Sequence, residues 1–482
     1  MQVNFRSGKD RYVMVPFEKL RNFQSQLKRD GVEAALVTSS TNLFYLTDLF
    51  ANAVLLVTPD QNWYFTDFRT MEVARQHFEG SGIHVEMAEG SFIPYIRELI
   101  LQQGISGVAM EDRALTVADA GHWKERLPVP VTWLDDRIEA LRQLKFPYEV
   151  ECTVRAQRIV ERSLHELLPF IKPGVSERDL AAELMYRFYK NGAEGLAFPV
   201  IILSGENTSL PHGFPGRRRV QNGDFITMDI GVKVGGYCSD MTRTFALGQV
   251  SDEMKRAYDT VLQAQRAGIA AIAPGKTGHE VDAAAREVID TSEFSGAFGH
   301  GLGHSVGLVC HDGLRAGQNS QDVFQQGNII TIEPGIYLER RFGLRIEDMV
   351  WLSPEGTKNL TEFPKELTIL LHSGGYTIFT EDRPGQVALS RLVLCSVFMA
   401  LRLHCQVSGA DLHHPLMMEG QPQPVRDALQ RPEGKQAGPG QLAEDVVGGE
   451  HGVVGGQAGV AVHHDPPGLV PLPDGLGRVV PT

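Results

Sequence analysis

The sequence lacks the features of membrane-spanning and secreted proteins. No run of about 18 apolar residues is present, and the best candidate, residues 392–401, is too short to span a bilayer. Residues 1–9 are polar and contain no signal-peptide apolar core. The five cysteines form no C-x-x-C pair and no dense disulfide framework. We therefore expect a cytoplasmic protein with reduced thiols and no membrane partner.

Basic residues are few relative to acidic ones. The chain has 46 Lys and Arg against 59 Asp and Glu, and its formal net charge is -13. Proteins that bind the phosphate backbone usually carry a basic excess, so we expect no nucleic-acid partner. Apolar residues make up 42% of the 482 residues, which is enough for a sizeable core and for two or three domains.

The C-terminal part of the chain lacks whole residue types. No isoleucine follows residue 378, no tyrosine follows residue 376, and no asparagine follows residue 359. Residues 374–482 nevertheless hold 17 glycines and 11 prolines. The missing residues are those with A- and U-rich codons. Our hypothesis is that residues 373–482 are a low-complexity tail, disordered or translated out of frame.

The rest of the chain alternates between helical and strand patterns. Short apolar strands and amphipathic helices alternate over residues 12–135, which predicts an α/β domain with a largely parallel sheet. Residues 136–150 read as a linker. Residues 151–372 follow the order helices, strands, helices, strands, which suggests two similar halves in a second domain.

Three segments of the second domain carry residues suited to chemistry. The first holds Asp229 in a buried-looking strand and Asp240 eleven residues later, beyond a turn at Gly235-Gly236. A hairpin would bring the two carboxylates face to face, where they repel unless a proton or cation lies between them. Taken alone, an aspartate in a turn-rich hairpin is more often a cap or turn residue.

The second segment is rich in histidine and glycine. Residues 298–307 hold His300 and His304 among four glycines, and His311 follows. A phosphate loop is the alternative, but the G-x-G-x-x-G spacing is absent and no lysine follows. Three histidines within twelve residues favour a binding or catalytic site.

The third segment ends two apolar strands on glutamates, Glu333 and Glu347. Burying a carboxylate is costly without a partner or a metal, although each could be a salt-bridged core acid. Together the segments supply two aspartates, two glutamates and a histidine. This oxygen-rich set suits Mn²⁺, Co²⁺ or Zn²⁺ and has enough carboxylates to bridge two cations.

The ordered set Asp229, Asp240, His304, Glu333 and Glu347 resembles the pita-bread metallopeptidases. The contexts are M-D-I-G, Y-C-S-D-M-T-R-T, G-H-S-V-G, I-E-P-G-I-Y and R-I-E-D. The match is to the Xaa-Pro peptidases, aminopeptidase P and prolidase, over residues 12–372. It implies an N-terminal domain of the creatinase and prolidase type before a pita-bread catalytic domain. It also implies two divalent metal ions, with Mn²⁺ preferred.

The resemblance implies a role for each ligand. Asp229 would chelate one ion, Asp240 and Glu347 would bridge both, and His304 and Glu333 would complete the second. A bridging water or hydroxide would attack the scissile carbonyl.

The resemblance also implies catalytic residues beside the metal ions. Glu333 would act as general acid and base. His212 matches a histidine on the substrate side, and His300 and His311 match histidines near the substrate carbonyl and proline. Arg345 and Tyr337 match residues behind the ligands, where Arg345 would orient a carboxylate.

Three features of the sequence depart from the family pattern or allow another interpretation. Asp312 follows His311 where many relatives carry glutamate. Residues 217–219 are three arginines that could attract an acidic peptide end, or that form a solvated loop. Cys238 lies two residues before Asp240, and we interpret it as a packing residue.

The predicted activity is hydrolysis of the bond between an N-terminal residue and proline, on a peptide with proline second. Creatinase-like C–N hydrolysis without metal and a non-catalytic binding protein are alternatives on the same fold, but both typically lose ligands that are present here. Dipeptidases and aminopeptidases of this family share the same metal centre, so the sequence does not decide between the two activities. The family also implies a homo-oligomer, a dimer or tetramer.

The tail hypothesis gives a first prediction. Truncation near residue 372 should leave peptidase activity and thermal stability intact, because the predicted core ends before that point. The measurements are the rate on an Xaa-Pro peptide and the melting temperature. A large loss of either would make the tail an integral part of the fold.

Overall fold

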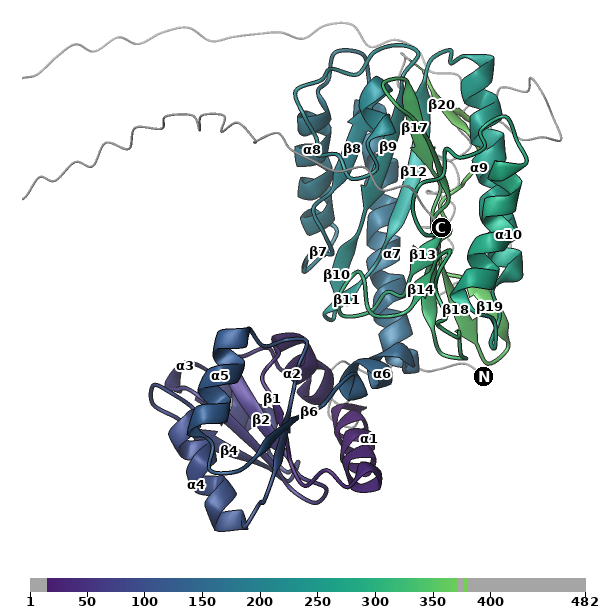
Figure 1. Ribbon diagram of the computed structural model, residues 1–482. Helices are drawn as coiled ribbons and strands as arrows, with labels where there is room; N and C mark the ends of the chain where they lie inside the picture. Colours follow the sequence, from purple (N-terminus) through teal and green to yellow (C-terminus); the bar gives the residue numbers. More distant parts are fainter. Residues whose placement is uncertain (1–14, 372–375, 379–482) are drawn as a thin grey trace, which may run out of the picture. The chain divides into compact units, whose positions relative to one another are not determined.

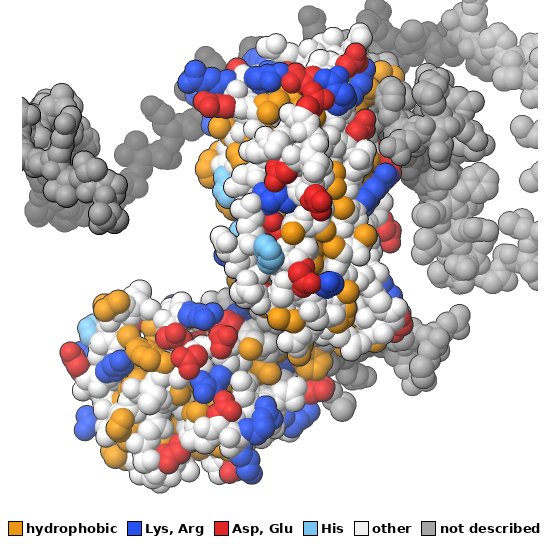
Figure 2. Space-filling model, turned by 45° about the vertical axis from the view of Figure 1, so that its right-hand side comes forward, with side chains coloured by type: hydrophobic (Ala, Val, Ile, Leu, Met, Phe, Trp, Pro, Cys, Tyr) orange, Lys and Arg blue, Asp and Glu red, His pale blue; other side chains and the backbone are white. Residues whose placement is uncertain are grey.

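The computed structural model describes residues 15–371 and 376–378 (Figure 1). The predicted tail therefore lies outside the described residues, except for its residues 376–378. Among the described helices, none is long and apolar enough to cross a membrane. On the face drawn in Figure 2, Lys and Arg are interspersed with Asp and Glu.

The N-terminal domain is built on one six-stranded sheet, in the order β4-β3-β2-β1-β5-β6. Its strands are β1 (Ala35–Val37), β2 (Ala53–Val57), β3 (Asn62–Thr66), β4 (Ile83–Met87), β5 (Val108–Met110) and β6 (Val131–Trp133). The pairs β3–β4, β1–β5 and β5–β6 are parallel, whereas β1–β2 and β2–β3 are antiparallel. The sheet is thus mixed, where a largely parallel one was predicted, because the connection between β2 and β3 is too short for a crossover.

Helices flank this sheet, and apolar residues fill both of its faces. The helices are α1 (Val15–Asp30), α2 (Ser40–Thr47), α3 (Phe68–His77), α4 (Ile93–Gln103) and α5 (Val117–Arg126). Along β1, Ala35 and Val37 join one apolar cluster while Leu36 joins another. Successive strand residues point to opposite faces, so one short strand supplies both layers. Helix α6 (Arg137–Gln143) then leads into the second domain.

In the second domain α7 packs against α8 and α9 packs against α10. Figure 1 shows strands between α8 and the α9–α10 pair. The helices are α7 (Pro147–Leu167), α8 (Glu177–Lys190), α9 (Asp252–Ala271) and α10 (Gly278–Asp290). Helices α8 and α10 each begin with a reciprocal capping box, Ser176 with Asp179 and Thr277 with Glu280. Each box satisfies two backbone donors that a helix N-terminus would leave unpaired.

The central strands form a five-stranded sheet, in the order β21-β20-β12-β9-β8. Its members are β8 (Ile201–Ser204), β9 (Phe225–Ile230), β12 (Met241–Leu247), β20 (Thr368–Leu370) and β21 (Tyr376–Ile378). Strand β21 pairs with β20 beyond residue 372, so a truncation there would also remove a short edge strand.

Shorter strands complete the domain around that sheet. They are β7 (Gly195–Leu196), β10 (Val232–Val234), β11 (Tyr237–Cys238), β13 (Gly303–His304), β14 (Arg315–Ala316), β15 (Ile329–Ile332), β16 (Gly335–Leu338), β17 (Phe342–Arg345), β18 (Asp348–Ser353) and β19 (Gly356–Asn359).

Arg243, on β12, ties the central sheet to the strands beside it. Its side chain is 2% exposed and donates to the backbone carbonyls of residues 242, 347, 363 and 364 at 2.6–2.9 Å. It also forms an ion pair with the buried carboxylate of Asp348 at 2.7 Å. A planar guanidinium can satisfy this many acceptors at once, and an ammonium cannot. Arg243 therefore fixes the backbone at Glu347.

Replacing this guanidinium predicts a large loss of stability. Arg243→Met should lower the free energy of unfolding by about 3–5 kcal/mol, because it leaves buried carbonyls and part of a buried charge unpaired. Arg243→Lys should recover only part of the loss. Urea denaturation followed by circular dichroism measures both.

The exposed pair Arg256–Glu293 provides the matched control. Arg256→Met should change the free energy of unfolding by less than about 1 kcal/mol. Equal losses from Arg243→Met and Arg256→Met would contradict the bracing role of Arg243.

Candidate metal centre

Two adjacent strands of the central sheet carry the predicted aspartates to one place. Asp229 lies on β9, and Asp240 comes directly before β12. The antiparallel register pairs Asp229 with Thr242 and not with Asp240, so the two carboxylates do not face each other across the ladder as a simple hairpin predicts. Both carboxylates nevertheless line the same cavity.

The glycine-rich segment lies directly against β15. A Cβ atom on Gly303 would lie 1.9 Å from the carbonyl oxygen of Thr331, so only glycine allows this approach. The amide of His304 donates to the Thr331 hydroxyl at 3.0 Å, and the amide of Glu333 donates to the Leu302 carbonyl at 2.8 Å. These contacts bring the His304 imidazole to within 3.4 Å of the Glu333 carboxylate.

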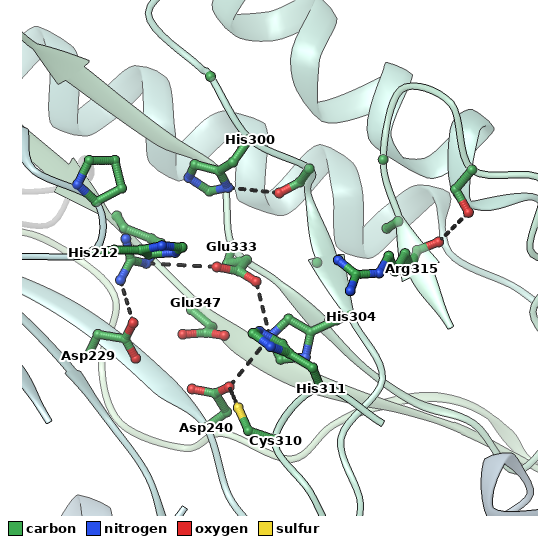
Figure 3. A pocket seen from close by; sticks show the side chains of 18 of the residues that line it. His212, Asp229, Asp240, His300, His304, Cys310, His311, Arg315, Glu333 and Glu347 are labelled. Carbon is green, nitrogen blue, oxygen red and sulfur yellow. Dashed lines mark hydrogen bonds and ion pairs between the residues drawn. The ribbon is translucent and has the colours of Figure 1, made fainter. Parts of the chain in front are cut away.

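The side chains of these segments converge in one cluster (Figure 3). Donor atoms of Asp240, His304 and Glu347 lie within 4.8 Å of one another, and all three residues are buried. The Nε2 atom of His304 lies 3.6 Å from Oδ2 of Asp240. Oδ1 of Asp229 is buried without a hydrogen-bond partner among the described residues. This donor set fits divalent cations, because carboxylates and an imidazole are their ordinary ligands.

The electrostatics of the cluster also favour a cation. Burial raises the pKa of Asp240 and of Glu347 well above the ordinary range, and neighbouring carboxylates raise both further. Burial raises the pKa of Glu333 to about 7, although Arg345 opposes the shift. Burial lowers the pKa of His304 to about 3, so its imidazole is neutral at pH 7. A bound cation would let the carboxylates ionise together.

Arg345 and the hydroxyl of Thr242 position the carboxylates of Asp229 and Glu347. The guanidinium of Arg345 forms an ion pair with Asp229 and donates to Thr242 at 3.0 Å and to Tyr337 at 2.8 Å. Thr242 in turn donates to Oε2 of Glu347 at 2.7 Å. Thr242 was part of the sequence motif, but its role follows only from the register that sets it opposite Asp229.

The other predicted histidines line the same cavity. His300 Nε2 lies 3.0 Å from the Tyr337 hydroxyl, and burial lowers the pKa of His300 to about 4. The ring of His311 meets the ring of His304 edge-on at 4.0 Å. His212 also lines the cavity and is exposed.

The cavity measures about 1020 Å³, the size of a small-molecule or peptide site. Its lining combines the charged cluster with apolar side chains. The apolar lining residues include Phe198, Pro199, Ile201, Pro211 and Phe214.

Several polar residues of the cavity escaped the sequence analysis, among them Cys310 and Arg315. Cys310 lines it and donates its thiol proton to Oδ2 of Asp240 at 3.1 Å. Arg315, on β14, also lines it. No spacing rule marks either one: Cys310 lies within the histidine-rich segment, and Arg315 lies on the short strand that follows it.

The segment that carries His311 is anchored by the N-terminal part of the chain. Arg142 forms a buried ion pair with Asp312 and donates to Asn42 at 2.8 Å. Gln143 donates to the Asp312 carbonyl at 2.6 Å and accepts from the Ser305 hydroxyl at 3.0 Å. Asp312, the departure noted in the sequence, is thus a structural anchor beside the cavity.

The remaining sequence interpretations concern Arg218, Arg219 and Cys238. Arg218 is half-buried and pairs with Asp224 at 2.6 Å, whereas Arg219 is exposed and donates to the Gly174 carbonyl at 2.5 Å. Cys238 is fully buried in an apolar cluster and acts as a packing residue.

Comparison with known proteins identifies the fold. Residues 19–144 match the Creatinase/Prolidase N-terminal domain, and residues 151–354 match metallopeptidase family M24. The uncharacterised peptidase YqhT of Bacillus subtilis is 36% identical over 358 residues, covering 73% of this chain and 99% of that protein. This chain belongs to metallopeptidase family M24. The resemblance drawn from the motifs is confirmed.

Solved M24 structures are similar over both domains. An Xaa-Pro dipeptidase from Bacillus anthracis gives a TM-score of 0.71 at 33% identity, covering 74% of this chain and all of that one. An X-Pro aminopeptidase from Thermotoga maritima gives 0.68 at 30%, covering 73% of this chain and 99% of that one. The predicted fold class, an α/β N-terminal domain before a pita-bread domain, is confirmed.

The Thr242 hydroxyl gives a prediction for this M24 centre. Thr242→Val should lower the affinity for Mn²⁺ by roughly 10–100-fold, because it removes the hydrogen bond to Glu347 and the acceptor for Arg345 without changing charge or shape. Titration of Mn²⁺ followed by calorimetry measures the affinity.

Thr227→Val is the matched control. Thr227 is also buried and lies on β9, and among the described residues its hydroxyl bonds to Thr244 alone. Its substitution should leave Mn²⁺ affinity within about threefold of wild type. Equal Mn²⁺ affinities in the wild type, Thr242→Val and Thr227→Val would show that Thr242 does not stabilise the metal centre.

Proposed function

We propose that this chain hydrolyses the peptide bond between an N-terminal residue and proline, with two divalent metal ions, most suitably Mn²⁺. The observation that carries the proposal is the convergence of the buried Asp240, His304 and Glu347 donors at a peptide-sized cavity. The names of the similar structures, an Xaa-Pro dipeptidase and an X-Pro aminopeptidase, support the substrate class.

Five residues would hold the ions: Asp229, Asp240, His304, Glu333 and Glu347. The unpartnered Oδ1 of Asp229 and the neutral imidazole of His304 both offer a free lone pair. When bound, the two ions would supply an activated water and polarise the scissile carbonyl. Their positive charge would also offset the repulsion among the four carboxylates.

Glu333 is the general acid and base of the proposed reaction. Its Oε1 accepts a hydrogen bond from Thr331 at 3.2 Å and lies 3.4 Å from His304, at the wall of the cavity. There its carboxylate takes the proton of the attacking water and delivers it to the leaving proline nitrogen. A carboxylate held at this position can move a proton in both directions.

The cavity histidines would bind and polarise the substrate. His311 can donate to the oxygen of the scissile carbonyl as it gains negative charge. His300 can do so only if it releases the Gly301 carbonyl or the Tyr337 hydroxyl, which its two ring nitrogens contact at 2.8 and 3.0 Å. His212 would contact the substrate from the cavity lining. Arg345 is a positioning residue, because it acts through Asp229 and Tyr337. The apolar side chains beside His212 offer a surface for the proline ring.

Cytoplasmic location and assembly into a dimer or tetramer stay predictions of the sequence. Light scattering on the purified full-length chain tests the second.

The proposed function predicts strict dependence on metal and on Glu333. The Mn²⁺-loaded protein should cleave Ala-Pro or Ala-Pro-Ala, and exhaustive chelation should abolish the rate. Glu333→Gln should lower kcat by roughly 10²–10⁴-fold, because it removes the proton-transferring group while keeping its size.

Comparing the dipeptide with the tripeptide assigns the length preference, and Ala-Ala serves as the control substrate. Glu366→Gln, at an exposed ion pair far along the chain, should leave kcat unchanged. Cleavage that survives chelation, or full turnover by Glu333→Gln, would refute the proposed mechanism.

A further inference from the structure

We propose that Cys310, His304 and His311 form a second metal site, for a thiophilic divalent cation of the zinc and cadmium type. The site shares His304 with the oxygen-rich set and competes with it. The binding part of this inference stands on geometry alone, whereas its inhibitory consequence rests on the proposed peptidase function.

The geometry places three soft or borderline donors together. The Sγ atom of Cys310 and one ring nitrogen each from His304 and His311 lie within 4.8 Å of one another. Donors around a tetrahedral zinc ion lie roughly 3.3–3.8 Å apart, so modest closure completes three corners. A thiolate with two imidazoles is a ligand set that zinc-type cations prefer and that Mn²⁺ does not.

The donors are also free to bind. His311 is exposed, and within residues 15–371 no hydrogen bond engages its ring nitrogens. Cys310 is only half buried and lines the cavity, so a cation can reach its sulfur from solvent. Its one hydrogen bond in that part of the chain goes to Asp240.

Binding requires one simple exchange. The S–H bond of Cys310 breaks, its proton passes to the buffer, and a sulfur–cation bond forms without any change in oxidation state. The hydrogen bond to Asp240 is lost in the same step. Because His304 can turn its lone pair to only one cation, occupancy of this site withdraws His304 from the oxygen-rich set. Cadmium should therefore inhibit a manganese-loaded enzyme.

Cadmium is the probe, because a cadmium–thiolate bond gives a charge-transfer absorption in the ultraviolet that carboxylate and imidazole ligands do not. The full chain is used with Cys395→Ser and Cys405→Ser, since these two cysteines lie outside the described residues. In this background one equivalent of Cd²⁺ should produce the band, and adding Cys310→Val should abolish it. Cys152→Ala, which removes a buried thiol on α7, should leave the band intact.

The second measurement is inhibition of Mn²⁺-loaded protein by Cd²⁺, expressed as a fraction of each variant's own uninhibited rate. Cys310→Val should raise the half-inhibitory Cd²⁺ concentration by at least about tenfold. If that variant folds poorly by circular dichroism, Cys310→Ser replaces it and should likewise lose the band.

Two results would overturn the proposal. One is an unchanged band in both Cys310 variants, and the other is inhibition of the Cys310-containing protein without any band. A protein that binds Cd²⁺ through sulfur but cleaves no Xaa-Pro peptide would refute the proposed function and leave the metal site standing.

Discussion

The second domain is built around one constraint, the mutual repulsion of four carboxylates in a largely buried cluster. Asp229, Asp240, Glu333 and Glu347 meet there, and the Arg345 guanidinium alone does not balance them. Burial and proximity both raise the pKa values of Asp240 and Glu347. Such a cluster persists only if the surrounding structure is rigid enough to hold it before a cation arrives. The buried network of Arg243 on the neighbouring strand supplies that rigidity.

Much of the architecture could be predicted because local patterns decide it. The alternation of helices and strands in both domains, and the buried strand that carries Asp229, follow from the spacing of apolar residues. The order of the five ligand-type residues and their contexts indicated the family, and the comparisons bear that out. Their individual roles are a matter for experiment.

Other features depend on contacts between distant segments, and no local pattern reveals them. The pairing of Asp229 with Thr242 depends on strand register, and the mixed N-terminal sheet depends on the connection between β2 and β3. Gly303 could be recognised as unusual, but its approach to Thr331 becomes clear only in space. Cys310 carries no spacing signal, because its significance comes from the imidazoles that the fold brings beside it.

The anchoring of Asp312 by Arg142 and Gln143 has a consequence for protein engineering. The second domain cannot be transferred alone, because side chains that precede residue 144 hold the segment that carries His311. A chimera that joins this half to a relative's N-terminal domain would need matching partners for Asp312 and Ser305. The exchangeable unit therefore begins upstream of α6.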